Sequence, residues 1–147
     1  MGYDKSAVDT VYVIIYYYQT VSYYFLGGNV MKNCIPDEIL LQVEKPARYT
    51  GNEINMVIKN PQKVDIRFGF CFPDVYEVGM SHLGLQILYY FLNRREDTYC
   101  ERVFAPWIDL EQKMREQNIP LFSIETQQYV KDFDFLGFTL QYEMSYT

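Results

Sequence analysis

The sequence predicts an α/β fold in which helices flank a parallel β-sheet. Three apolar, β-prone segments (64–72, 100–105 and 133–140) alternate with two segments of helical pattern. This order of strand, helix, strand, helix, strand is typical of right-handed parallel crossovers. The first strand is apolar almost throughout, interrupted by Asp65 and Arg67, as expected of a strand buried on both faces.

Two local patterns precede the first strand. A short helix is predicted to begin at Pro36, because proline suits the first helical turn. Apolar residues follow at helical spacing, namely Ile39, Leu40 and Val43. The helix ends before Lys45, since a residue that precedes proline is disfavoured in the helical conformation. Residues 46–53 are polar and turn-rich, and we expect an ordered loop there.

Pro73 ends the first strand, and we expect a loop over 74–81. A helix is predicted from Leu83 to Asn93, with Ser81 as its N-cap. Its side chains are apolar nearly all round, and such a helix is usually covered on both sides. We therefore expect the sheet on one side of the helix and a partner domain on the other.

The second strand, 100–105, ends at Pro106. Apolar residues then mark one stripe of a second helix (Trp107, Leu110 and Met114), and two pairs at i,i+4 spacing mark its wet side (Asp109 with Lys113, Glu111 with Arg115). Residues 119–123 are expected to be extended. We expect residues 34–147 to form a Rossmann-like or flavodoxin-like domain with the first strand central. Because few residues follow the third strand, 133–140, we expect this domain to be truncated at the C-terminus.

Residues 1–33 differ from the rest of the chain. They hold seven of the fifteen tyrosines, and the stretch from Thr10 to Met31 contains no charged residue. Such a run is long enough to span a bilayer, but tyrosine prefers the membrane interface, and no signal-peptide pattern is visible. We expect a peripheral or disordered extension, which is what a start codon placed too far upstream would produce. An added strand or helix, or a membrane anchor, is the alternative.

Composition excludes several classes of protein. The 147 residues suit one domain, and the net charge of −6 argues against direct binding of nucleic acid. Three widely spaced cysteines (Cys34, Cys71 and Cys100) do not form a disulfide scaffold, and no CxxC spacing suggests a metal site. We expect a cytoplasmic protein, because unpaired cysteines fit a reducing compartment.

The expected ligand site lies beyond the carboxyl ends of the strands, where open parallel sheets bind ligands. The segments that leave these ends are 73–81, 105–107 and 141–145. Gly79 and Gly84 are expected to allow close approach of the backbone where the helix begins. Only part of the GxGxxG pattern is present, so nicotinamide binding is not favoured.

No residues form a complete catalytic constellation. His82, the sole histidine, faces the pocket as a ligand or proton donor, or else is satisfied by hydrogen bonds at the helix start. Asp74 and Glu77 are an acid/base pair or carboxylates that favour the helix dipole, and Glu143 has the same two interpretations. Cys71 is expected in the core, and Trp107 as a packing anchor or a pocket wall.

Several stretches, in this order, carry a resemblance to a known family: 45–49 (KPARY), 72–84 (FPDVYEVGMSHLG), 101–107 (ERVFAPW), 119–123 (IPLFS) and 137–143 (GFTLQYE). Residues 45–147 resemble the N-terminal, cobalamin-binding-like domain of an uncharacterised family of radical S-adenosylmethionine (SAM) proteins. The resemblance leaves out residues 1–33.

The resemblance implies a Rossmann-like module that precedes a radical SAM barrel, whose three cysteines hold a [4Fe–4S] cluster that cleaves SAM. This chain lacks those cysteines and is expected to be inactive alone. Cobalamin is the implied cofactor. Domains that ligate its cobalt usually carry Asp-x-His-x-x-Gly, whereas this chain reads Ser81-His82-Leu83-Gly84, which favours cobalamin held by shape and backbone contacts, or none.

We therefore expect a cofactor- or substrate-side module of a radical SAM enzyme that docks the barrel through helix 83–92. The residues expected to form its cofactor-facing rim are Pro73, Asp74, Val75, Tyr76, Glu77, Gly79, Met80, Ser81, His82, Gly84, Gln141, Tyr142 and Glu143. The rival interpretation is a non-catalytic interaction module that binds no cofactor. It predicts a rim filled by the side chains of Tyr76, Met80 and Tyr142.

Overall fold

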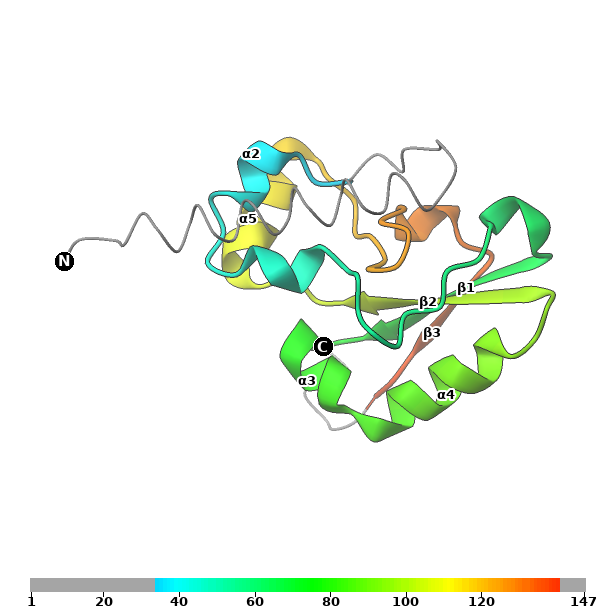
Figure 1. Cartoon of the computed structure of the whole chain (residues 1–147). Coiled ribbons are helices and arrows are strands. Elements are labelled where there is room, and N and C mark those ends of the chain that lie inside the picture. The colour runs from blue at the N-terminus through cyan, green and yellow to red at the C-terminus, as the bar shows by residue number, and fades with distance from the viewer. Residues whose placement is uncertain (1–33, 141–147) are drawn as a thin grey trace. The chain divides into compact units, whose positions relative to one another are not determined.

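The computed structural model describes residues 34–140. Within this range three strands form one parallel sheet in the order β2-β1-β3, with β1 at Ile66–Phe72, β2 at Thr98–Phe104 and β3 at Phe135–Phe138. The predicted α/β fold of the Rossmann or flavodoxin type, with the first strand central, is confirmed (Figure 1).

One face of the sheet packs against α4 (Leu83–Asn93), whose bounds are those predicted from the sequence. Side chains alternate between the faces of a strand, and Phe70 and Phe72 share a core cluster with Leu85 and Tyr89 of α4. Cys100 and Phe104 of β2, together with Ile124, complete this cluster. Cys71 is buried, as expected of a small apolar residue in β1.

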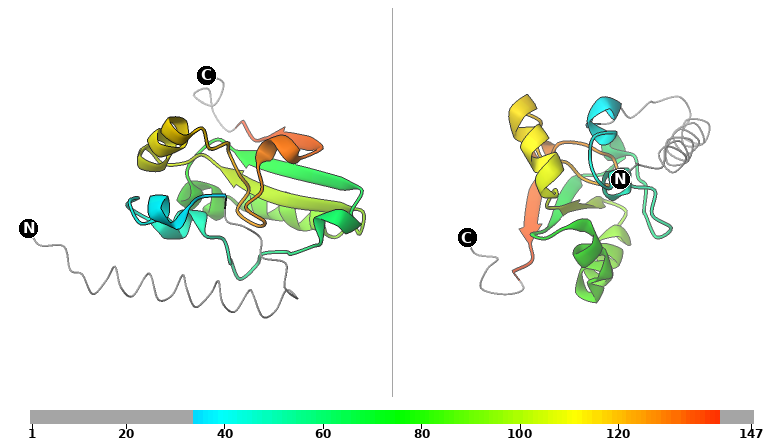
Figure 2. Two further views of the ribbon diagram at one scale, coloured as in Figure 1. Left: turned by 90° about the horizontal axis from the view of Figure 1, so that it is seen from above. Right: turned by 90° about the vertical axis from the view of Figure 1, so that its left-hand side faces the viewer.

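A second core cluster lies between α2 (Asp37–Leu40) and α5 (Ile108–Gln117), which Figure 2 shows side by side. It contains Ile35, Ile39, Leu40, Val43, Tyr49, Leu110, Met114 and Phe122. The apolar stripe predicted for the second helix is therefore confirmed at Leu110 and Met114. Trp107 precedes the helix as its N-cap residue and is half-exposed.

Of the two ion pairs predicted on α5, the structure contains one. Arg115 bonds the carboxylate of Glu111. Asp109 instead accepts the backbone N–H of Glu44, and Lys113 donates to the side chain of Gln42. The prediction of an Asp109–Lys113 pair is wrong, because both residues bond to the chain that follows α2.

The structure also corrects the loop predicted over 74–81. Residues Tyr76–Ser81 form a short helix, α3, and the 3₁₀ turn η1 (Pro46–Tyr49) forms part of the loop predicted over 46–53. Ser81 ends α3, and its hydroxyl donates to the carbonyl of Val78 at 2.8 Å. Ser81 is therefore not the N-cap of α4; His82 takes that position.

The outer edge of β2 is covered by the segment that follows α5. Phe122, inside the stretch predicted to be extended, makes a single antiparallel bridge with Tyr129, and the N–H of Ile124 donates to the carbonyl of Arg102 at 2.9 Å. A 3₁₀ turn, η3 (Val130–Asp132), then leads into β3.

Some expectations fall outside this part of the chain. The extension over 1–33 and the rim residues Gln141, Tyr142 and Glu143 lie beyond the described residues, so the expectations for them stay predictions. In the range that the structure does describe, no helix has both the length and the apolar character that crossing a membrane requires.

Candidate functional site

The carboxyl ends of β1 and β2 lie at the same edge of the sheet, as predicted. The segments that leave them are held together by a hydrogen bond of 2.9 Å from the N–H of Ala105 to the carbonyl of Asp74. The carboxylate of Asp74 accepts the N–H of Val75 at 2.7 Å. Two of the three segments expected at the ligand site therefore meet; the third begins beyond Leu140.

Gly79 is required by packing inside the module. A Cβ atom at this position would lie 2.2 Å from Cε1 of Phe104, which is closer than any side chain tolerates. At Gly84 the space is taken by the ring of His82, with a Cβ 2.9 Å from its Cε1. The space that a side chain would need at Gly79 and Gly84 is thus occupied by the rings of Phe104 and His82.

Two further rim residues, Tyr76 and Met80, contact the core that α4 covers. The ring of Tyr76 packs edge-on against Phe104, with centroids 5.7 Å apart, and its hydroxyl donates to the carboxylate of Glu53. Burial and the adjacent Glu53 carboxylate raise the pKa of Tyr76. The sulfur of Met80 lies 3.3 Å from Nη1 of Arg102. Both side chains therefore take part in packing the module.

His82 caps α4. Its Nδ1 accepts the backbone N–H of Leu85 at 3.1 Å, and its ring lies 5.2 Å from the ring of Phe72. A neutral imidazole that accepts at Nδ1 carries its proton on Nε2. Of the two interpretations given for His82, this contact is the one expected of a histidine satisfied at a helix start.

The outer side of the rim is an ion-pair cluster. Glu77 accepts Nε of Arg48 at 2.8 Å and lies 3.5 Å from Nζ of Lys45. Partial burial opposes ionisation of Glu77, but Arg48 and Lys45 outweigh it and lower the pKa of the carboxyl. The guanidinium of Arg48 also lies 5.2 Å from the centre of the Trp107 ring.

This cluster gives Glu77 and Trp107 definite partners. Glu77 is paired with two cations, and the ring of Trp107 packs against one of them, Arg48. The backbone N–H of Trp107 donates to the hydroxyl of Tyr49 at 3.0 Å. Sequence reasoning did not place Arg48 at the rim. The available signal was a basic and aromatic stretch, 45–49, in an otherwise polar loop.

A buried charge network, also missed from the sequence, lies under the rim. Arg102 donates through Nε to Glu125 at 2.7 Å, and both side chains are fully buried. Its guanidinium lies 4.3 Å from the centre of the Tyr89 ring. Burial raises the pKa of Glu125 to about 7, although Arg102 works in the opposite direction.

The neighbouring residue in β2 builds the other half of this network. Glu101, which is fully buried, accepts Nη2 of Arg67 and the hydroxyl of Ser123, each at 2.7 Å, and the N–H of Thr126 at 3.2 Å. Adjacent opposite charges inside an otherwise apolar strand, Glu101 and Arg102, were the signal in the sequence. Their partners were not deducible, because they lie more than twenty residues away.

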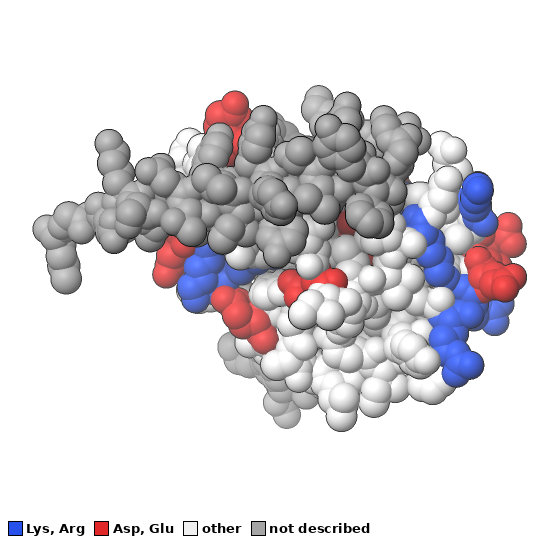
Figure 3. All heavy atoms as spheres, viewed as in Figure 1, with Lys and Arg blue, Asp and Glu red and all other residues white. Residues whose placement is uncertain are grey.

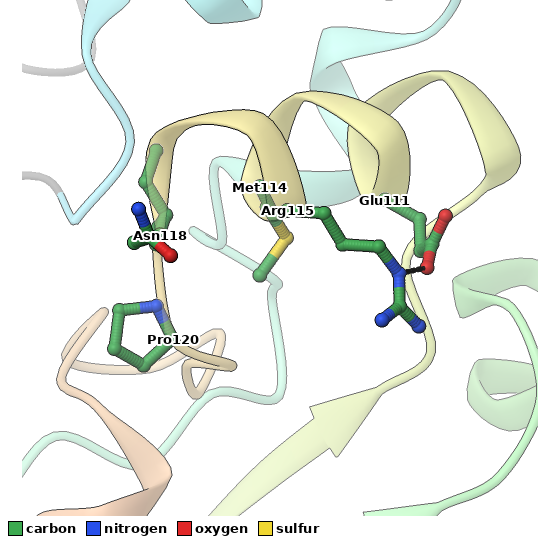
Figure 4. A pocket seen from close by; sticks show the side chains of 6 residues that line it. Glu111, Met114, Arg115, Asn118 and Pro120 are labelled. Atoms are coloured by element: carbon green, nitrogen blue, oxygen red, sulfur yellow. Dashed lines mark hydrogen bonds and ion pairs between the residues drawn. The ribbon is translucent and has the colours of Figure 1, made fainter.

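One hollow among the described residues, shown in Figure 4, lies away from this rim. It has a volume of about 480 Å³ and lies at the end of α5, where its lining includes Met114, Asn118 and Pro120. It opens beside the exposed Glu111–Arg115 ion pair. The hollow therefore does not include any residue predicted for the cofactor-facing rim.

Residues 34–140 bring together no group of three His, Cys, Asp or Glu side chains that could hold a metal ion. Cys71 and Cys100 are buried in different strands, and Cys34 is half-buried beside the carbonyl of Gln127. Burial raises the pKa of the Cys34 and Cys71 thiols to about 11. These cysteines are therefore placed as packing residues.

Comparison with known proteins gives one match. Residues 84–147 match the family model described as radical SAM proteins, N-terminal. Neither the curated proteins nor the solved structures gave a match. The matched range begins at Gly84 and takes in nearly all of α4, β2, α5 and β3, whereas the rim residues from Pro73 to His82 precede it. This part of the chain is similar to the N-terminal segment of radical SAM proteins.

Proposed function

We propose that residues 34–147 are the N-terminal module of a radical SAM protein, and that α4 docks this module on the domain that holds the iron–sulfur cluster. The match over 84–147 supports the kind of protein. The observation that carries the docking role is the exposed side of α4.

This side of α4 is apolar. Leu85 and Tyr89 are buried against the sheet, whereas five large apolar side chains on the helix are between 45 and 71% exposed: Leu83, Ile87, Leu88, Tyr90 and Phe91. No charged residue occurs from Leu83 to Asn93. Figure 3 shows no charged side chains on the surface where α4 lies in Figure 1. A group of charged side chains begins at the right of the view, beyond the end of the helix. A contiguous apolar surface of this kind is typical of an interface.

Cross-linking at Leu88 tests the docking role. The chain with benzoylphenylalanine at position 88 is irradiated in an extract of its native cells, and adducts are identified by mass spectrometry. We expect an adduct whose partner contains the CxxxCxxC stretch of a radical SAM domain. Benzoylphenylalanine in place of Gln117, which is exposed on α5, is the matched control and should give no such adduct. Equal adducts at both positions, or none at position 88, would contradict the proposal.

Cobalamin is the cofactor that the resemblance implies for the rim, and the observed contacts do not fit ligation of cobalt by His82. Its Nδ1 is engaged by Leu85, which leaves Nε2 protonated and unable to coordinate a metal. Our proposal for the rim is therefore limited to cobalamin held by shape and backbone contacts.

The second candidate function, an interaction module with no cofactor, is supported by Tyr76 and Met80. Both were expected to fill the rim if no cofactor binds, and both contact the core. In this case the exposed side of α4 serves binding alone. The same surface then has a structural partner in place of a catalytic one.

A titration with hydroxocobalamin separates the two candidates. We expect no spectrum of histidine-ligated cobalt, and we expect the variant His82→Asn, which keeps a capping side chain, to retain as much cobalamin as the wild type. Retention in both supports a cofactor held by shape, and retention in neither supports the interaction module. Loss of cobalamin in His82→Asn alone would show that the assignment of His82 as a cap is incomplete.

A further inference from the structure

The two edges of the sheet are treated differently by the chain. Along β2, the N–H of Arg102 donates to the carboxylate of Glu125 and the N–H of Cys100 donates to Asn93, so that the outer edge is closed. Among residues 34–140, no strand pairs with the outer edge of β3, which Figure 2 shows at the border of the sheet.

β3 also has the composition of an inner strand. Phe135, Leu136 and Phe138 are 58, 43 and 62% exposed. Because successive side chains point to opposite faces, apolar side chains are exposed on both faces of the strand. Exposed edges in natural proteins are usually protected by a charge, a proline or a bulge. The stretch 135–140 contains no charged residue and no proline.

We propose that β3 pairs with β3 of a second copy of this chain. The two strands run antiparallel about a two-fold axis at Gly137, so that the sheet continues through both copies. This surface is separate from the exposed side of α4, and the inference goes beyond the function proposed above.

The hydrogen-bonding pattern of β3 fixes this register. The N–H of Thr139 donates to the carbonyl of Cys71 in β1. Because backbone groups alternate in direction along a strand, those of Phe135 and Gly137 also turn towards β1. The groups of Leu136 and Phe138 turn outward. An axis at Gly137 places Leu136 opposite Phe138 of the second copy, and each such pair exchanges both of its hydrogen bonds.

Side chains and charges are compatible with this arrangement. Leu136 and Phe138 of the second copy form an apolar pair on one face, which occurs twice by symmetry. On the other face Gly137 meets Gly137 of the second copy, where no side chain intervenes. The two copies of Asp134 are six positions apart, about 20 Å along the strands. This exceeds the screening length of about 8 Å at physiological salt, so their repulsion is weak.

The interface is small, so association should depend on concentration. Sedimentation equilibrium of the full chain is expected to give the monomer mass of 17.5 kDa when dilute and to approach twice this mass as concentration rises. A monomer at every accessible concentration would overturn the proposal.

Charge exchange tests the register. In the variant Leu136→Lys/Phe138→Lys, each lysine faces a lysine of the second copy, and we expect a monomer. In the variant Leu136→Lys/Phe138→Glu, each lysine faces a glutamate, and we expect the dimer to be retained. The two variants lose the same apolar side chains, so a general loss of folding affects both alike. Equal masses for the two would overturn the proposed pairing.

Phe91→Lys, at an exposed position of α4 one turn after Leu88, is the control for the other surface. It should leave the dimer intact while removing the adduct that benzoylphenylalanine at position 88 is expected to form. A dimer that is lost in Phe91→Lys and kept in Leu136→Lys/Phe138→Lys would assign self-association to α4 and overturn the role of β3. The failure of one proposal is thus distinguishable from the failure of the other.

Discussion

At a pH well above the Glu125 pKa of about 7, where its carboxyl is ionised, replacing Glu125 by glutamine is expected to lower the free energy of unfolding by about 3 kcal/mol, the cost of breaking a buried ion pair. The substitution removes the charge that faces Arg102 and leaves a guanidinium fully buried beside Tyr89. Urea denaturation of the full chain, followed by circular dichroism, measures the change as a lower midpoint.

The expected loss of stability in Glu125→Gln comes from the unpaired charge of Arg102, and a second variant tests this cause. Arg102→Met/Glu125→Gln removes both charges and keeps an acceptor for the backbone N–H at position 102. We expect the double variant to be more stable than Glu125→Gln alone, because replacing both members of a buried pair is often close to neutral. A double variant that is less stable than the single one would contradict this account.

A solvent-exposed ion pair is the matched control for the buried pair of Arg102 and Glu125. Glu111 and Arg115 form an ion pair on the surface of α5, where Arg115 is largely exposed. Glu111→Gln is expected to change the free energy of unfolding by less than about 1 kcal/mol, as is usual for exposed pairs. Similar losses at Glu111 and Glu125 would show that burial does not set the contribution of the Arg102 pair.

The sheet was predictable because the amino-acid composition of its strands indicates how deeply they are buried. Residues 64–72 are apolar on both faces, and the strand they predict is β1, the central strand. The bounds of α4 were predictable because apolar side chains fill this stretch of the chain. These signals are local, so they do not depend on the partners of each segment.

α3 could not be predicted, because no local signal of this kind marks it as a helix. It has six residues, includes a glycine and begins two residues after Asp74. The pair Pro73 and Asp74 favours a loop. Its helical form depends on packing of Tyr76 and Met80 into the cluster under α4, a tertiary effect. Once α3 extends to Ser81, that serine cannot cap the next helix, and the error in the N-cap follows from the error in α3.

The candidate site was predictable in location and not in detail. Parallel strands bring 73–75 and 105–107 together whatever their side chains are, and the structure confirms this. Contacts such as Arg48 with Glu77, or Arg102 with Glu125, join residues more than twenty positions apart. No local pattern encodes such partners, so the roles of Glu77 and Met80 depend on the three-dimensional structure.

Gly79→Ala is expected to lower the free energy of unfolding by about 1 to 3 kcal/mol, the range for overpacking a core. Alanine favours a helix over glycine by about 1 kcal/mol, so a loss of stability at a helical glycine is informative. Its physical cause is the ring of Phe104, whose Cε1 and Cδ1 would lie 2.2 and 2.5 Å from the new Cβ.

Gly84→Ala is the control for this prediction. Its Cβ would meet only the ring of His82, at 2.9 Å, and a side chain can move where a packed ring under α3 cannot. We expect a change of less than about 1 kcal/mol in either direction. The combination Gly79→Ala/Phe104→Leu should recover part of the stability, because the smaller side chain makes room for the methyl group.

The two possible roles of Gly79 give opposite results in these measurements. If the glycine serves packing, Gly79→Ala lowers the urea midpoint and Phe104→Leu compensates for it. If it serves the approach of a ligand to the backbone, Gly79→Ala leaves the midpoint unchanged and weakens retention of cobalamin. The 2.2 Å distance to Phe104 predicts the first result, and an unchanged midpoint would return Gly79 to the cofactor-facing rim.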